Sequence, residues 1–163
     1  MKKLAPVFKG LLFLLLPGIF LTSCSKDDPG INESFNWSLN DKAYTAGTGA
    51  HAARVPGSSQ VVINGFTNAV SQLQITIENC DKAGTYIAKG LSMVPDSVFL
   101  HLQVGDDIYN TVNNSVTETV VITITKLTSN SIQGNFNGTV HAVVASGAGP
   151  AYSLKGEFNL KLW

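Results

Sequence analysis

The sequence predicts an all-β protein: a single antiparallel β-sandwich or partly open barrel of about eight to ten strands, following a cleaved signal peptide. Three observations predict this fold. Apolar and polar residues alternate with period two, β-branched residues and threonine are abundant, and turn-forming residues recur about every 8–12 positions. The expected organisation is a lipoprotein signal peptide at 1–23, a lipidated cysteine with a flexible tether at 24–34, and one antiparallel β domain at 35–163.

The first segment has the parts of a secretory signal peptide. A basic start (Lys2, Lys3 and Lys9) precedes an apolar run centred on 11–16, which Pro17-Gly18 interrupts. The uninterrupted run is shorter than the roughly 20 apolar residues that span a bilayer, whereas a signal peptide needs only about 7–15. We therefore expect a cleaved signal rather than a transmembrane helix.

The cysteine at the end of this segment predicts how the protein is held. Leu21-Thr22-Ser23-Cys24 has the pattern of a bacterial lipobox. The Cys24 thiol can form a thioether to diacylglycerol, and two or three acyl chains such as palmitate hold a protein firmly at a membrane. The stretch from Cys24 to Asp28 is similar to the acidic export signal of lipoproteins in the Bacteroidota. We expect a lipid-anchored outer-membrane protein, with surface exposure favoured over the periplasmic leaflet.

Five later segments alternate clearly enough to predict strands with one buried face. They are 70–78, 97–104, 116–126, 132–144 and 152–162. Such alternation is typical of antiparallel strands with one face on a core and the other in water. In the fourth segment it places Val144 inside and His141 outside.

The last two of these segments predict a hairpin around a shared core. Phe136 and Phe158 fall on inward faces, and Glu157 falls on an outward one. Three glycines also occupy inward positions: Gly134, Gly138 and Gly156. Glycine there predicts bulges, strong coiling or a side chain packed closely across the strand. The connection at 146–150 can reverse the chain but is longer than a two-residue turn.

Several motifs together resemble a family. Val120–Leu127, followed by a turn and the I-x-G-x-F-x-G pattern of Ile132–Gly138, resembles small lipoproteins of the Bacteroidota of unassigned function. The opening hairpin Phe35–Ala46 and the strand start Ala83–Ile87 are similar to further motifs of that family. Asn40-Asp41 departs from its usual Asn-Gly, which disfavours a type I′ turn. The resemblance implies an envelope location and an all-β fold, and it carries no catalytic residue.

Charge and cysteine content exclude some functions. The full chain has 11 basic and 11 acidic residues, and losing 1–23 leaves 8 basic residues, a net charge of −3. With no basic run left, we expect no nucleic-acid partner. Cys80 has no cysteine left to pair with once Cys24 carries lipid, and its acidic neighbours disfavour a thiolate. A packed thiol is therefore expected rather than a nucleophile.

The sequence predicts no catalytic or metal site and no cofactor. It has no Gly-x-Ser-x-Gly elbow and no His-x-His or His-Glu-x-x-His spacing. His101 and His141 lie on polar faces and would make half of a metal site only if their strands were neighbours in register. The candidate ligand contacts are aromatic residues near strand ends or termini: Trp37, Tyr44, Tyr109 and Trp163. Such residues stack on sugars or contact proteins, and packing in the core or at its rim is the alternative.

These observations predict a non-enzymatic cell-envelope lipoprotein that serves as a surface-exposed binding, adhesion or accessory module. Its expected partners are the membrane, through the lipid anchor, and a glycan or a protein. A small-molecule or lipid carrier using a barrel interior is the main alternative, and a hydrolase is a more distant one. A carrier needs an open cavity, whereas a module fills its interior and binds outside.

Overall fold

A computed structural model describes residues 30–67, 71–88, 98–111, 119–144 and 147–163. These residues form an all-β structure of eleven strands in one antiparallel, strongly curled and open half-barrel sheet. The strands are β1 (Ser34–Leu39), β2 (Lys42–Thr45), β3 (His51–Arg54), β4 (Val61–Phe66), β5 (Ser71–Ile77), β6 (Gly84–Ala88), β7 (Val98–Val104), β8 (Asp107–Asn110), β9 (Val120–Leu127), β10 (Ser131–Val144) and β11 (Gly147–Lys161). The predicted fold class is confirmed. The number of strands exceeds the expected eight to ten because β2, β3 and β8 have only four residues each, too few for alternation to be visible.

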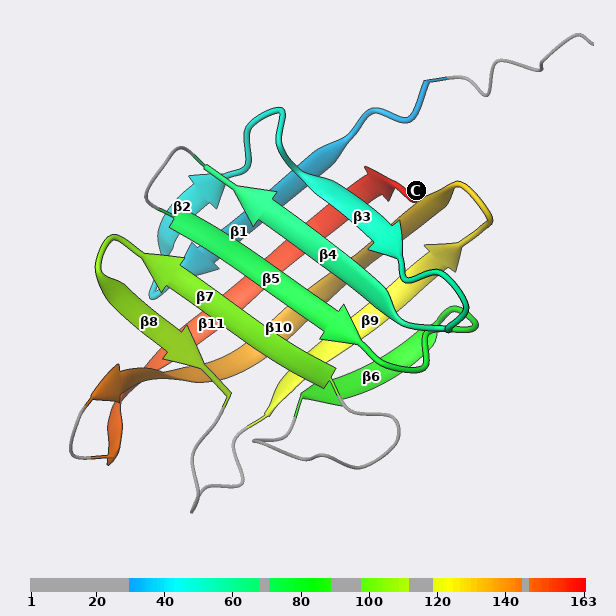
Figure 1. Ribbon diagram of the computed structural model, residues 1–163. Coiled ribbons are helices and arrows are strands. Elements are labelled where there is room, and N and C mark those ends of the chain that lie inside the picture. Colours follow the sequence, from blue (N-terminus) through cyan, green and yellow to red (C-terminus); the bar gives the residue numbers. More distant parts are fainter. Residues whose placement is uncertain (1–29, 68–70, 89–97, 112–118, 145–146) are drawn as a thin grey trace, which may run out of the picture.

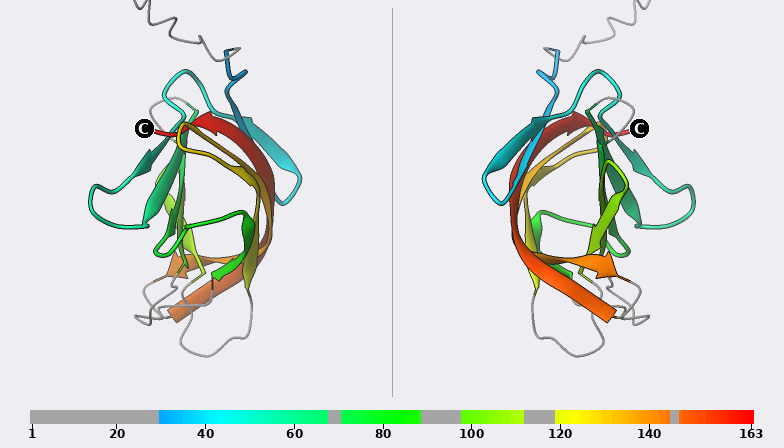
Figure 2. Two further views of the ribbon diagram at one scale, coloured as in Figure 1. Left: turned by 90° about the vertical axis from the view of Figure 1, so that its right-hand side faces the viewer. Right: turned by 90° about the vertical axis from the view of Figure 1, so that its left-hand side faces the viewer.

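The sheet folds over into two layers (Figures 1 and 2). We call β3, β4, β5, β7 and β8 the front layer, and β2, β1, β11, β10, β9 and β6 the back layer. The neighbours along the sheet run β2-β1-β11-β10-β8-β7-β5-β4-β3, while β6 pairs with β9 and β9 with β10. The core lies between the two layers, where the inward faces of both meet.

The layers are joined where β10 changes partner. Its first half, Ile132–Gly138, pairs with β9, and its end, at His141 and Ala142, pairs with β8. A register shift between His141 and Val143 bends the strand there. Beyond this bulge the alternation changes phase, so that 40% of Val144 is exposed. The expectation that Val144 points inward is therefore wrong. The expectation that His141 lies outside is wrong as well, because only 9% of His141 is exposed and its Nδ1 lies 3.0 Å from the Gly149 carbonyl oxygen.

The β10–β11 hairpin is longer than predicted. Val143 pairs with Ala148 and Val144 with Gly147, so only residues 145 and 146 separate the two strands. The connection is as short as a two-residue turn, contrary to the expectation of a long loop at 146–150. The small residues that suggested a loop are instead the start of β11.

The β1–β2 turn also differs from expectation. Asn40 and Asp41 have φ angles of 45° and 64°, and Leu39 pairs directly with Lys42 around them. Positive φ at both central residues is the requirement of a type I′ turn. Asn and Asp tolerate this region better than other non-glycine residues. The Asn40 side chain also accepts a hydrogen bond from the Ser153 backbone N–H at 2.8 Å, which holds the turn against β11.

Phenylalanine rings fill the space left by glycines on facing strands. Phe136 is the register partner of Gly156, and Phe158 is the partner of Gly134. A Cβ atom added to Gly134 would lie 2.7 Å from Phe158 Cζ, so only glycine leaves room for the ring. Phe35 joins both rings in edge-to-face contacts at 6.0 and 5.9 Å. This confirms that Phe136 and Phe158 share one core and that the inward glycines allow close packing.

Both ends of the described chain are held at the same end of the sheet. Ala52 of β3 forms a parallel bridge with Leu162. The backbone N–H of Trp163 donates to the Ala52 carbonyl, and the Trp163 carbonyl accepts from the backbone N–H of Arg54. At the other terminus, the Glu33 carboxylate accepts a hydrogen bond from the Lys161 N–H at 3.0 Å. The strand β1 thus begins at Ser34, and the residue before it already contacts β11.

Candidate functional site

Three of the four predicted aromatic residues lie close together. Trp37 stacks on Tyr44 with ring centroids 5.6 Å apart, and Tyr109 meets Tyr152 edge to face at 4.9 Å. Burial raises the pKa of Tyr109, and the nearby Asp107, Tyr152 and Tyr44 raise it further. The two pairs of rings are therefore neighbours at one end of the core. Trp37 and Tyr109 are almost fully buried, whereas Tyr44 is partly exposed.

The remaining predicted residues lie elsewhere. Trp163 is 69% exposed, and the Lys161 ammonium lies 4.1 Å from its ring centroid in a cation–π contact. This ring is far from Trp37. Trp37 pairs with Gly156 of β11, and the extended chain of β11 continues for five more residues, to Lys161. Cys24 and the signal peptide lie outside the described residues.

Cys80 is a buried thiol just after β5. It has no exposed surface, and burial is the main reason that its pKa is raised. A hydrogen bond with the Tyr86 side chain and the positive charge of Arg54 act in the opposite direction. The Arg54 guanidinium also donates a hydrogen bond to the Cys80 carbonyl at 3.2 Å. The protonated thiol fits the packing role expected from the sequence.

The outer side of the front layer has an arrangement that strand patterns alone do not reveal. Six polar side chains fall into one row that crosses six strands, each being the register partner of the next. In order they are His51, Asn64, Gln74, His101, Asn110 and His141. We call this the histidine–amide row. It contains all three histidines of the chain, and at about 4.8 Å per strand it extends over roughly 24 Å of sheet.

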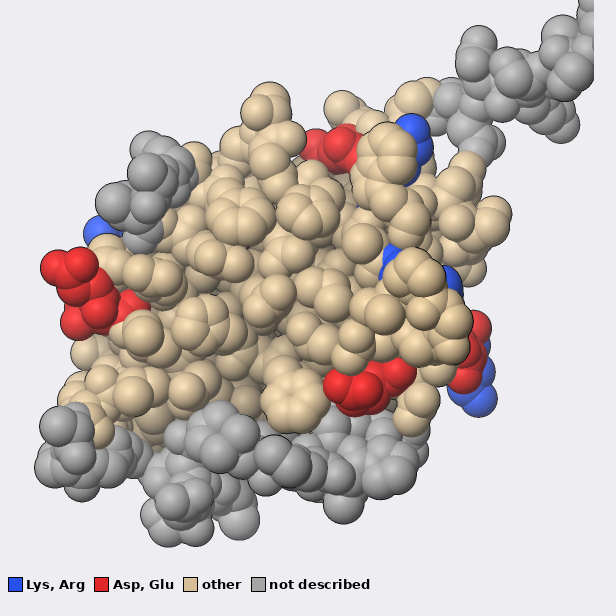
Figure 3. Space-filling model, in the orientation of Figure 1, with Lys and Arg blue, Asp and Glu red and all other residues tan. Residues whose placement is uncertain are grey.

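Two further rows flank it. One consists of Phe66, Gln72, Gln103 and Ile108, and the other of Ala53, Val62, Thr76 and Phe99. We call the three rows together the uncharged face, because none of these described side chains is a lysine, arginine, aspartate or glutamate. In the space-filling view, uncharged side chains occupy the middle of this face, and most of the acidic and basic groups drawn in colour lie toward its edges (Figure 3).

The upper end of the histidine–amide row is fixed by hydrogen bonds. His51 Nδ1 lies 2.9 Å from the Gly49 carbonyl oxygen, which can only accept, so Nδ1 carries the proton. The neutral Nε2 then accepts a hydrogen bond from Asn64 Nδ2 at 3.2 Å. Asn64 is 8% exposed, and this orientation leaves its Oδ1 buried with no donor among the described residues. The row thus contains an amide oxygen that lacks a hydroxyl or N–H partner.

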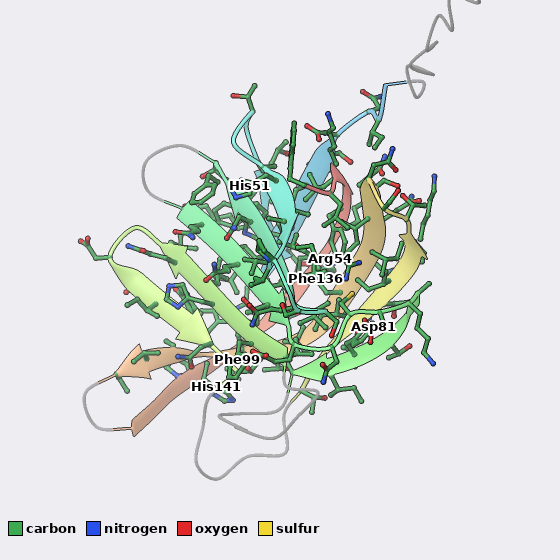
Figure 4. The ribbon with its side chains drawn as sticks, turned by 45° about the vertical axis from the view of Figure 1, so that its right-hand side comes forward. His51, Arg54, Asp81, Phe99, Phe136 and His141 are labelled. Atoms are coloured by element: carbon green, nitrogen blue, oxygen red, sulfur yellow. The ribbon has the colours of Figure 1, made fainter. Side chains whose placement is uncertain are left out.

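Aromatic rings stand on both flanks of the row. The Phe66 ring stacks against His51, with centroids 6.2 Å apart and planes 20° from parallel. Phe99 lies on the opposite flank, beside Thr76. Figure 4 shows His51 near one end of the face, and Phe99 and His141 near the other, while Phe136 lies between the layers. Both phenylalanines are partly exposed, unlike those of the back layer.

The outer side of the back layer is different in character. It carries Lys155 and Glu157 on β11 among threonine, serine and asparagine side chains. Residues of β1, β2, β10 and β11 line a shallow depression of about 490 Å³ there, and they include the predicted candidates Trp37 and Tyr44 beside Asn36, Asn135 and Glu157. The predicted outward position of Glu157 is confirmed, since its side chain is exposed.

The histidines do not form a metal site. His101 and His141 share a row, but Asn110 lies between them, so their strands are two spacings apart, about 10 Å. Among the described residues, no group of three or more histidine, cysteine, aspartate and glutamate side chains is arranged to hold a metal ion.

The part of the chain that the structure describes includes no helix with the length and apolar character needed to cross a bilayer.

Comparison of the chain with protein-family models, with curated proteins and with solved structures finds no match in any of the three.

Sequence reasoning missed the uncharged face as a unit. The alternation expected for 70–78 and 97–104 is present in β5 and β7, where it puts Gln72, Gln74, Phe99 and His101 on the outward side. Their alignment with residues of β3, β4, β8 and β10 depends on cross-strand register, which a single strand does not encode. The available signal was the lack of charge at these outward positions.

Proposed function

We propose that this protein is a non-enzymatic binding module, held by a lipid on Cys24 at the outer membrane and facing the cell exterior. The lipobox, the acidic stretch after Cys24 and the resemblance to small lipoproteins of the Bacteroidota support the location. The observation that carries the binding role is the uncharged face. Five strands expose a surface of amides, imidazoles and phenyl rings, whereas the outer side of the back layer carries charges.

The packing of the core favours binding on the outside over a carrier function. Ring atoms of Phe35, Phe136 and Phe158 occupy the space beside Gly65, Gly156 and Gly134. A carrier needs an apolar interior with room for a ligand, and here three aromatic rings occupy the part of the interior that these glycines border. The outer surface of the sheet is where a ligand can bind without displacing the core.

The location is tested by fractionating cells that express Cys24→Ala. Cys80→Ala is a matched control, because it removes the other cysteine of the mature chain. We expect the Cys24 variant to leave the membrane fraction and the Cys80 variant to stay in it. Protease added to intact cells should digest the wild-type domain. Membrane retention of the Cys24 variant, or full protection from protease, would contradict the proposed anchor or its orientation.

A further inference from the structure

We infer that the uncharged face binds a neutral carbohydrate chain that lies along the histidine–amide row. The inference rests on the proposed binding function and names its ligand class.

The first argument is charge. The three rows contain no formally charged side chain, although the mature chain carries a net charge of −3. A nucleic acid, a sulfated polymer or another anion would require cations at the contact. A cationic partner would require carboxylates there. The surface therefore suits a ligand that is itself neutral.

The second argument is hydrogen bonding. Amide side chains present both donors and acceptors, as does each hydroxyl of a sugar. The face has five of them: Asn64, Gln72, Gln74, Gln103 and Asn110. The Asn64 Oδ1, near one end of the row, lacks a donor in the described structure, and a buried acceptor without a partner is unfavourable.

The third argument is the position of the rings. Phe66 and Phe99 stand on opposite flanks of the polar row and are partly exposed. A pyranose ring has apolar C–H faces and a polar rim of hydroxyls, so a phenyl ring and a nearby amide can bind the two parts together. His141, at one end of the row, is only 9% exposed, so the accessible part runs from His51 to Asn110 over roughly 19 Å at 4.8 Å per strand. This length fits an oligosaccharide better than a single sugar.

A second copy of the chain fits this surface less well. The centre of a homodimer interface is apolar, and buried polar groups there must all find partners. Here the centre is the histidine–amide row, and the apolar side chains lie on its flanks. The hydroxyl groups of a sugar can form hydrogen bonds with the polar side chains of this row more readily than the same row of a second copy can.

The test is affinity electrophoresis of the whole protein, extracted in a neutral detergent, in native gels containing dextran, mannan or laminarin, with heparin as the charged comparison. Circular dichroism first establishes that each variant is folded. We expect at least one neutral polysaccharide to retard the wild type and heparin not to do so. Gln74→Ala and Phe99→Ala should each weaken that retardation at least tenfold. Gln133→Ala, which removes an exposed glutamine from the back layer, should leave it unchanged.

Three results would overturn the inference. The first is the absence of retardation by all three neutral polysaccharides. The second is retardation that Asn135→Ala abolishes and Gln74→Ala does not, since this places the ligand in the depression on the back layer. The third is a dimer in sedimentation equilibrium that Gln74→Glu dissociates, which assigns the face to a second copy. None of these affects the membrane anchor, whose failure appears separately as membrane retention of Cys24→Ala.

Discussion

The two layers of this protein use aromatic residues and charges in opposite ways. In the back layer, Phe35, Phe136 and Phe158 point inward onto glycines, while Lys155 and Glu157 point outward into water. In the front layer, the inward hydrophobic side chains are aliphatic except for Tyr109 on β8, and Phe66 and Phe99 point outward on a face without charge. The back layer thus holds the aromatic part of the core, whereas the front layer presents its rings on a surface available for recognition.

The largest expected effect is on the aromatic core of the back layer. Truncation of Phe158 to alanine removes a ring that is 1% exposed and should lower the free energy of unfolding by about 3–5 kcal/mol. Glu157→Ala, on the opposite face of the same strand, should change it by less than about 0.5 kcal/mol. Urea unfolding of both variants measures the contrast. A larger loss for Glu157→Ala would reverse the assignment of inner and outer faces.

The next largest effect on stability is expected where the Phe136 ring packs against Gly156. An alanine at Gly156 would place its Cβ against the Phe136 ring and 2.5 Å from the Asn36 carbonyl oxygen. We expect Gly156→Ala to lower the free energy of unfolding by about 1–3 kcal/mol through overpacking. Gly84→Ala in β6 is the control, because nothing lies within 4 Å of its added Cβ. Equal melting temperatures for the two variants would show that the Phe136 ring can pack against a side chain at position 156 without loss of stability.

A smaller effect is expected for the aromatic residues of the front layer. Phe99 is partly exposed, so Phe99→Ala should cost about 1 kcal/mol or less. The matched comparison is Phe158→Ala, the same truncation in the other layer. Urea unfolding tests this comparison independently of any ligand. A loss as large as that of Phe158→Ala would make Phe99 a core residue and would remove it from the candidate binding surface.

These comparisons also show which parts of the structure the sequence could predict. Alternation identified the inward and outward faces of β5, β7, β10 and β11 because one face of each strand is buried. It failed at Val144, where the bulge changes the phase of β10, and at the start of β11, where small residues resemble a loop. The histidine–amide row was not predictable, because it arises from the cross-strand register of six strands, which the alternation within each strand does not determine. Of the aromatic candidates, only Trp163 is largely exposed.

The smallest expected effect is a loss of stability at alkaline pH. Burial raises the pKa of Cys80 above its ordinary value of 9.0 in the folded state. As the pH rises through that value, the unfolded chain loses the thiol proton while the folded chain keeps it, so unfolding becomes more favourable. The free energy of unfolding should therefore fall above about pH 9. In Cys80→Ala this fall should be shallower, although Tyr86 and Tyr109, whose pKa values are also raised from 10.0, still contribute at higher pH. An identical slope in the variant would contradict the role assigned to the thiol.

The position of β1 determines how the domain would bear mechanical load. The chain from the proposed anchor enters β1 at Ser34, and the Glu33 carboxylate is already bonded to the Lys161 backbone. Tension along this segment acts parallel to β1, which is hydrogen-bonded to β11 on one edge and to β2 on the other (Figure 1). Hydrogen bonds pulled in this direction share the force as a group in shear, rather than breaking one after another as in a peeled hairpin. A cell-surface domain attached through this strand would stay folded while a ligand held on the front layer is pulled away from the membrane.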